Sequence, residues 1–188
     1  MTLGQIMMLA LRQLDEDPQD ISEYDDLFRL YANAGYRIAV QEYVKPRDVR
    51  ELRSDKGGVI WLDSDVRRVV SIKRKKDGRD VIFTLTPDAS AIKVGGKEER
   101  YEAVCEIKCD DMQKDDDEPT YLPEEAHDAL VDYVCYRHLS NGNMAKQSRA
   151  QFYQTQFYQA MQRLRPQGFG SVTTFKHLYS VTDIRYRG

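Results

Sequence analysis

The stretch 118–165 constrains the fold most, because two helical patterns in it flank the turn-forming pair Asn141-Gly142. Pro123 suits a first helical position, and Asn-Gly favours a helix C-terminus. Asn143 can cap the next helix, and Pro166 stops it. The apolar residues of the first helix are Ala126, Ala129, Leu130, Tyr133 and Val134. Those of the second are Ala150, Tyr153, Phe157, Ala160, Met161 and Leu164. This spacing predicts an antiparallel helix hairpin.

The N-terminal region predicts a second pair of helices. Thr2 and Gln5 form a capping-box pattern before an apolar helical face that reaches Leu14. A polar loop around Pro18 separates it from a helix running from about Ser22 to Tyr43, which Pro46 ends. The predicted main stripe of that second helix is Leu27, Leu30, Tyr31, Ala34 and Ile38. Its other face carries the small residues Ala32, Gly35 and Ala39. We therefore expect it to pack on two sides.

From Val49 to Cys109 the hydrophobic period changes to two, which indicates strands. Residues 59–62 read as a short buried strand, and 66–75 and 79–85 flank Asp77-Gly78, a strong hairpin signal. Residues 92–94 and 101–109 predict a further hairpin across Gly95-Gly96. The residues that alternate onto one face of its second strand are Tyr101, Ala103, Cys105, Ile107 and Cys109. An acidic linker, 110–118, leads back to the helices.

The last segment, 167–188, is too apolar for a discarded tail and has no helical stripe. Its apolar residues are Phe169, Phe175, Leu178, Tyr179, Val181, Ile184 and Tyr186. They can pack on the chain's own sheet, or add as a strand to another chain, where main-chain bonds give affinity. The residues alone leave both alternatives open.

Together these patterns predict an α+β fold, mainly α. Its four-helix core consists of two helix hairpins, with a small antiparallel β-domain inserted between the second and third helices and an extended C-terminal arm. The predicted boundaries are 1–48 for the first helix pair, 49–117 for the β-domain with its acidic linker, 118–166 for the second pair and 167–188 for the arm.

Charge is distributed in alternating blocks along the 188 residues. The net charges are −5 for 1–44, +4 for 45–109, −8 for 110–139 and +6 for 140–188. The total of −3 argues against a protein that coats nucleic acid or is drawn to membranes by charge. Unlike blocks suit subunits that meet side by side, although solvated faces produce the same pattern. Three cysteines without a secretory leader indicate a reducing compartment, and no apolar run is long enough to predict a membrane span.

The strongest metal candidate combines Cys105, Cys109, Cys135 and His138. Cysteines four apart on a strand are separated by about 13 Å. Two thiolates on one zinc lie within about 4 Å of each other. The strand prediction therefore excludes this zinc site, and we expect the cysteines to be packing residues.

Catalytic and cofactor motifs are missing from the sequence. Gly95-Gly96-Lys97 lacks the first glycine and the hydroxyl of a phosphate-binding loop. The acidic runs lack the glycine and closing glutamate of a calcium loop. His127 is expected to be a partly buried structural side chain. We therefore expect no enzyme, cofactor or metal, since no set of catalytic roles can be assembled.

One basic run stands out: Lys73, Arg74, Lys75 and Lys76 flank the predicted hairpin turn, with Arg67 and Arg68 nearby. Such a run on a small sheet can contact phosphate, which gives the alternative function of a DNA-binding module over residues 67–79. Hairpin tips are also ordinarily charged, so the run alone does not decide between the two.

The helical parts resemble the head–tail adaptor, or connector, proteins of tailed bacteriophages. The resemblance covers residues 1–45 and 118–165, and the tail more loosely. In the second helix it includes Asn33 within the run 31–36, Y-A-N-A-G-Y. In the second helix pair the matching residues are Pro119, Leu122, Pro123, His127, Leu130, Val131, Tyr133, Ala145, Tyr153 and Leu164. The size of the insert makes the chain similar to the larger, tail-tubular-A type of the short-tailed phages.

The resemblance implies a structural virion protein of the neck, assembled in the host cytoplasm. It implies a twelve-membered ring that docks under the dodecameric portal protein through the arm, extends the DNA channel and anchors the tail or nozzle protein below. DNA passing through the channel would make only transient contact. A negative channel would keep DNA from adhering, and Asp115, Asp116 and Asp117 are the acidic residues we assign to it.

Overall fold

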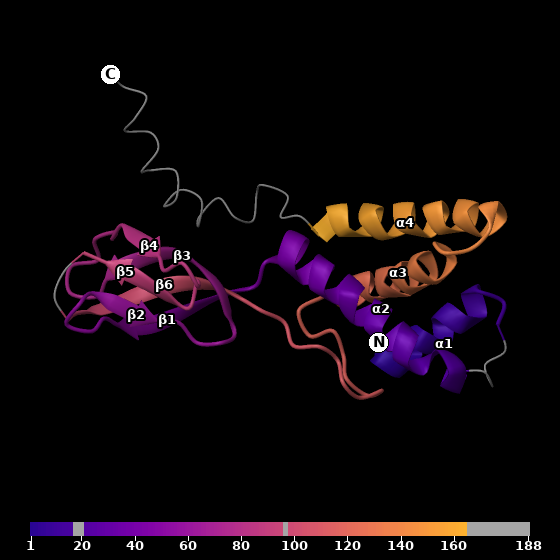
Figure 1. Ribbon diagram of the computed structural model, residues 1–188, viewed down its shortest axis with the longest axis horizontal. Helices are drawn as coiled ribbons and strands as arrows, with labels where there is room; N and C mark the ends of the chain where they lie inside the picture. Colours follow the sequence, from indigo (N-terminus) through magenta and orange to yellow (C-terminus); the bar gives the residue numbers. More distant parts are fainter. Residues whose placement is uncertain (17–20, 96–97, 165–188) are drawn as a thin grey trace, which may run out of the picture. The chain divides into compact units, whose positions relative to one another are not determined.

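The computed structural model describes residues 1–16, 21–95 and 98–164 and divides the chain into two compact units (Figure 1). The helical unit comprises Met1–Val44 and the chain from Asp111 onward, and the β-unit is Lys45–Asp110. The predicted mixed α+β class is confirmed. The sequence placed the inserted segment at 49–117, whereas the structure assigns the acidic linker after Asp110 to the helical unit.

Helix bounds in the helical unit follow the predicted start and stop signals closely. Helix α1 spans Leu3–Gln13, and α2 spans Ile21–Ile38 and continues as a π-helical segment, η2, over Ala39–Val44. A 3-10 turn, η3, covers Glu124–Ala126 before α3, His127–Leu139, and α4 covers Met144–Leu164. The capping box at Thr2 is present, and the Asn143 side chain accepts from the backbone N–H of Lys146 at 3.1 Å.

Helix α3 is central to the helical unit, since it packs against α1, α2 and α4 (Figure 1). Its predicted apolar arc, from Ala126 to Val134, is buried as expected. Cys135 and Leu139 are buried as well. Helix α3 is therefore a buried core helix and not a surface helix with a single apolar face.

The predicted main stripe of α2 is wrong. Leu27 and Leu30 are 39% and 55% exposed, and the buried residues lie on the other face. The buried apolar side chains of α2 and η2 are Phe28, Ala32, Tyr36, Ala39 and Val40. The physical reason is close helix packing: a Cβ placed on Gly35 would lie 2.8 Å from Cδ1 of Tyr133 in α3. The small-residue face lets the two helices approach closely, and the larger leucines remain on the outside.

The β-unit consists of two three-stranded antiparallel sheets. One has the order β1-β6-β3, with β1 at Arg47–Arg53, β3 at Val66–Arg74 and β6 at Arg100–Ile107. The other has the order β2-β5-β4, with β2 at Val59–Trp61, β4 at Phe83–Leu85 and β5 at Ala91–Val94. Side chains from both sheets share one apolar core, which includes Ile60, Ile72, Ile92, Tyr101 and Cys105.

Strand partners differ from the predicted hairpins. The Asp77-Gly78 turn is present, with Gly78 at φ +67°, but pairing beyond it is limited to a bridge between Lys73 and Asp80. The chain then crosses to the other sheet, where β4 pairs with β5. Strands β5 and β6 belong to different sheets, so the second predicted hairpin is wrong. Alternation determines which face of a strand is buried, whereas its partner depends on how the two sheets close over their common core.

Candidate interaction surfaces

The acidic linker is part of the helical packing. The backbone carbonyls of Asp117 and Asp115 accept from the N–H groups of Leu3 and Gly4 at 2.8 and 2.9 Å, which satisfies the first turn of α1. The Asp115 carboxylate lies 2.6 Å from Nη2 of Arg29 in α2. Two of the three residues assigned to a channel surface therefore help to hold α1 and α2 in place.

Asp117 and Asp116 differ in their surroundings. The Asp117 carboxylate accepts backbone hydrogen bonds from Lys114 and Gln113, which hold the pKa of that carboxyl below its usual range. Asp116 is exposed and has no ion-pair partner among the described residues. Of the three residues, it retains the properties expected of a solvent-facing charge.

Asn33 attaches the linker to α2. Its side-chain amide donates to the carbonyl of Met112 at 3.0 Å and accepts from the Met112 N–H at 2.8 Å. Both residues are buried. Nearby, the hydroxyl of Tyr36 accepts from the backbone N–H of Tyr121 at 3.2 Å. Asn33, which the resemblance singled out, thus has a physical role in fixing the path of the chain between the two helix pairs.

Two residues of the basic run at the β3 turn, Arg74 and Lys75, form ion pairs with carboxylates. Arg74 lies 2.8 Å from Glu99 and 3.3 Å from Asp77, and Lys75 pairs with Glu51. The charges of Glu99 and Asp77 raise the pKa of Arg74 above its ordinary value. A hollow of about 320 Å³ at this position is lined by Arg74, Lys75, Lys76, Glu99 and Arg100. In register, Lys73 stands opposite Glu102 of β6. The surface is of mixed charge rather than a uniform phosphate-binding patch.

The neighbouring arginines surround a buried glutamate, Glu106, which no sequence motif marks. Glu106 is 1% exposed, and both its oxygens lie 2.8 Å from the guanidinium of Arg68. Arg67 and Arg47 approach at 3.8 and 3.9 Å. Burial acts to raise the pKa of Glu106, but the Arg68 hydrogen bonds and the three positive charges outweigh it, so the pKa is lowered. The place of Glu106 between Cys105 and Ile107, next to the basic strand β3, was the available signal.

The four residues considered for a zinc site, and excluded from it by the strand prediction, belong to two different units of the chain. Cys105 lies in the core of the β-unit. Cys135 belongs to the helical unit, where its thiol donates to Gln13 Oε1 at 3.5 Å and to Ala10 O at 3.7 Å. Burial, with a smaller effect of Asp132, raises the pKa of Cys135 to about 12, so it is a neutral thiol. The His138 ring packs edge-on against Tyr24 and Phe28. Over residues 1–16, 21–95 and 98–164, no group of three His, Cys, Asp or Glu is placed to hold a metal.

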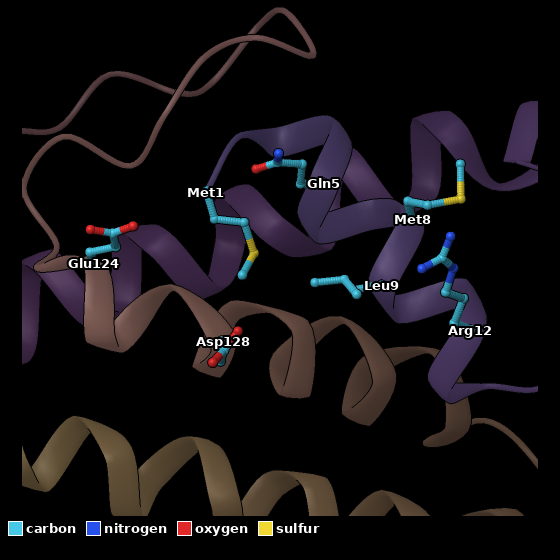
Figure 2. A pocket seen from close by; sticks show the side chains of 7 residues that line it. All are labelled: Met1, Gln5, Met8, Leu9, Arg12, Glu124 and Asp128. Carbon is cyan, nitrogen blue, oxygen red and sulfur yellow. The ribbon is translucent and has the colours of Figure 1, made fainter.

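A hollow of about 630 Å³ lies between α1 and the start of α3 (Figure 2). Its lining residues are Met1, Gln5, Met8, Leu9, Arg12, Glu124 and Asp128. Figure 2 shows Asp128 from α3 below Leu9 of α1, with Glu124 and Arg12 toward opposite ends. The lining provides two carboxylates and one guanidinium.

His127, close to this hollow, has the predicted structural role. It is 5% exposed, with Nε2 3.1 Å from the carbonyl of Leu122 and Nδ1 2.9 Å from the amino nitrogen of Met1. Both ring nitrogens therefore have partners within the helical unit, which fixes the orientation of the ring. Helices in the described part of the chain are all too short or too polar to cross a membrane.

The residues assigned to the arm, Phe169, Phe175, Leu178, Tyr179, Val181, Ile184 and Tyr186, lie outside the described residues. The last described residue of the chain is Leu164, at the end of α4. Helix α4 contacts α3, η2 and η3. The assignment of the arm to a partner stays a prediction. No protein-family model matches the chain, and a search of curated proteins found no match.

Proposed function

We propose that this chain is a head–tail adaptor of a tailed bacteriophage, of the larger tail-tubular-A type. In this proposal twelve copies form a ring under the portal, the ring extends the DNA channel, and the tail or nozzle protein binds below. The protein acts by binding and not by catalysis. It is assembled in the host cytoplasm and becomes part of the virion neck. The support comes from the resemblance in residues 1–45 and 118–165.

One observation carries the proposal: Asn33, the residue of α2 that the resemblance includes, binds the backbone of Met112 in the linker that returns to α3. These two hydrogen bonds give Asn33, which matches the adaptor family, a structural role. The Asn33 side chain holds the linker that joins the inserted β-domain to the second helix hairpin. We infer that the four-helix core of two hairpins, the inserted β-domain and the C-terminal arm together form the adaptor architecture.

The decisive experiment is a binding assay with the portal protein encoded by the same genome. Full-length chain and a version ending at Pro166 are each mixed with portal and imaged by electron microscopy. We expect the full chain to cap the portal as a closed ring and the shortened chain to remain unbound. A mass measurement on the free protein is no substitute, because an adaptor can assemble only on its portal.

Matched variants in the arm test whether its apolar side chains are needed for portal binding. Replacing Tyr179 and Ile184 together by serine removes apolar contact while keeping the length of the chain. We expect this double variant to bind portal more weakly, whereas a Ser171→Ala, Ser180→Ala control binds normally. If the full-length chain itself does not bind the portal protein, the proposed function is wrong. If both versions bind equally, the function stands and the arm has another role.

The DNA-binding alternative receives less support, because Arg74 and Lys75 are paired with carboxylates and Arg68 is bound to Glu106. Measuring duplex affinity against salt concentration tests it directly. A protein that neutralises several phosphates loses affinity steeply as salt rises. We expect weak binding with a shallow slope, as suits transient contact with passing DNA.

A further inference from the structure

The outer face of α2 carries an apolar stripe that the described residues of the helical unit cover only in part. Leu27 and Leu30 are 39% and 55% exposed, and Ala34 follows one turn after Leu30. These residues lie on the side of the helix opposite to the buried Phe28 and Ala32. We name Leu27, Leu30 and Ala34 the α2 stripe. Leu27 and Leu30 are neighbours on the helix surface, with half-buried Ala34 beside them, and exposed apolar side chains that lie together are a feature of association sites.

Negative charge borders the stripe at its N-terminal end. Glu23 and Asp26 are exposed, lie one to two turns before Leu30, and have no ion-pair partner within the described part of the chain. Other charged residues of α2 form ion pairs within the same copy. Arg29 pairs with Asp25 and with Asp115 of the linker, and Arg37 pairs with Asp111. The stripe therefore fits an occupant that brings an apolar side chain together with positive charge.

Helix α4 presents such a surface on its outer side. Phe152 is 60% exposed and points away from the buried residues Ala150, Phe157 and Met161. The sequence of α4 contains no acidic residue. Of its cations, Arg149 is already paired with Asp15 and bound to the carbonyl of Gln13, which leaves Arg163 as the cation on the outer side. Arg163 follows Phe152 by eleven residues, which at 3.6 residues per turn places it in the same row. We name the row of Phe152, Gln159 and Arg163 the α4 row.

The α2 stripe and the α4 row face outward from different sides of one subunit. Helices α2 and α4 both pack on α3, and Figure 1 shows α3 between α4 and the α1–α2 pair. Each surface lies on the side of its helix turned away from the buried face. The two surfaces of a single copy therefore do not cover each other, and a second copy can join them.

We propose that the α2 stripe of one copy binds the α4 row of a second copy, with Phe152 against Leu27 and Leu30 and Arg163 on the side of Glu23 and Asp26. Such a contact joins unlike surfaces, so each copy keeps one of each surface open. Contacts of this type generate a ring if the rotation closes and a filament if it does not. The inference deepens the proposed function and rests on it only for closure of the ring.

Photo-crosslinking identifies the occupant of the stripe. The full-length chain with a photoreactive benzoylphenylalanine at position 30 is mixed with ¹⁵N-labelled wild-type chain, alone and in the presence of portal. After irradiation, crosslinked peptides are identified by mass spectrometry, and the isotope pattern separates contacts between copies from contacts within one copy. We expect crosslinks between copies, from position 30 to peptides of residues 144–164.

Two variants and one control complete the design. Phe152→Glu, at an exposed position, is expected to lower the crosslink yield by about tenfold. Asp26→Lys is expected to lower it by a smaller factor, because its charge lies near the edge of the contact. The same photoreactive residue at exposed Arg12 of α1 should give no crosslink to α4 of another copy. Unchanged thermal melting shows that each variant is folded.

Several other crosslinking results would contradict the α2–α4 contact. A crosslink from position 30 to residues 167–188, to the β-unit or to position 30 of another copy overturns the proposal, as does none at all with or without portal. If a ring forms on the portal without the α2–α4 crosslink, the proposed function stands and this inference is wrong. If the crosslink forms while the portal stays bare, self-association stands and the adaptor function is wrong.

Discussion

At the scale of single residues, the ionisation of Asp132 is expected to affect the stability of the helical unit. It is half-buried on α3, and burial, together with the charge of Asp128, raises its pKa from an ordinary 3.8 to about 6. The folded state therefore holds the proton more tightly than the unfolded state. This contribution to stability is fully present below about pH 4 and is lost as the pH rises through about 6.

Replacing Asp132 by asparagine removes the charge and keeps the shape. We expect Asp132→Asn to raise the free energy of unfolding by about 1–2 kcal/mol at pH 8, with the gain shrinking toward pH 4. Urea unfolding at the two pH values measures this difference. Exposed Asp116→Asn is the control for the same substitution at the surface and should change the free energy of unfolding little. An equal effect of Asp132→Asn at both values would contradict the titration argument.

The side chain of Asn33 makes two buried hydrogen bonds to the backbone of Met112. Asn33→Ala leaves a buried N–H and a buried carbonyl unpaired, so we expect a loss of about 2–4 kcal/mol in unfolding free energy. Denaturant unfolding measures the loss, with exposed Gln151→Ala as a near-neutral control. A loss no greater than that of the control would show that the linker does not depend on this residue.

At the scale of elements, the contact between α2 and α3 depends on the absence of a side chain at Gly35. Alanine there would gain about 1 kcal/mol in helix propensity. Its Cβ, however, would lie 2.8 Å from Tyr133. We expect the clash to prevail and Gly35→Ala to destabilise the fold by about 1–3 kcal/mol. Thermal unfolding checks this, with Gly95→Ala, where the added carbon meets no neighbour within 4 Å, for comparison. A stabilised Gly35→Ala variant would refute close packing of the two helices.

Glu106 connects the three strands of the β1-β6-β3 sheet, because the arginines around it come from both neighbouring strands. Glu106→Gln leaves the positive charges without their buried counter-charge, and we expect a loss of about 3 kcal/mol. The lowered pKa means that this contribution is present at neutral pH and is lost as the pH falls through the folded pKa.

Unfolding of Glu106→Gln followed by tryptophan fluorescence tests this, since Trp61, the single tryptophan, lies in the β-unit. Glu98→Gln, which breaks the exposed pair with Arg53, should cost far less. Equal losses for the two variants would mean that the buried position adds nothing.

At the scale of the whole molecule, the two ends of the β-unit lie side by side. The N–H of Ile107 donates to the carbonyl of Pro46 at 3.0 Å, and Arg47 stands opposite Glu106. The helical unit can therefore be joined across this point. We expect a chain in which a short Gly-Ser linker replaces 45–110 to keep its helical circular dichroism and a cooperative melt. A matched chain that instead lacks α4, which packs on central α3, should lose cooperativity. Collapse of the first chain would show that the helical unit requires the β-unit.

Local features were readable from the sequence because they depend on neighbours a few residues away. The capping box at Thr2, the cap at Asn143 and the buried arc of α3 are confirmed. Four of the five residues predicted to share a face of β6, from Tyr101 to Ile107, are buried. The structural role of His127 was also predicted correctly.

Features that depend on distant partners were decided by the tertiary structure. The sequence pointed to the larger residues of α2, but packing at Gly35 buried the opposite face. It located the basic run but not the carboxylates of Glu51 and Glu99 that pair with it.

The sequence by itself determined the class of each segment, because periodicity and caps are local properties of the chain. Only the tertiary structure decided which strands pair, which face of α2 stays open and that the acidic linker supports α1. These outcomes depend on the free energy of contacts between residues far apart in the chain, and no local pattern records which of several competing contacts is the most favourable.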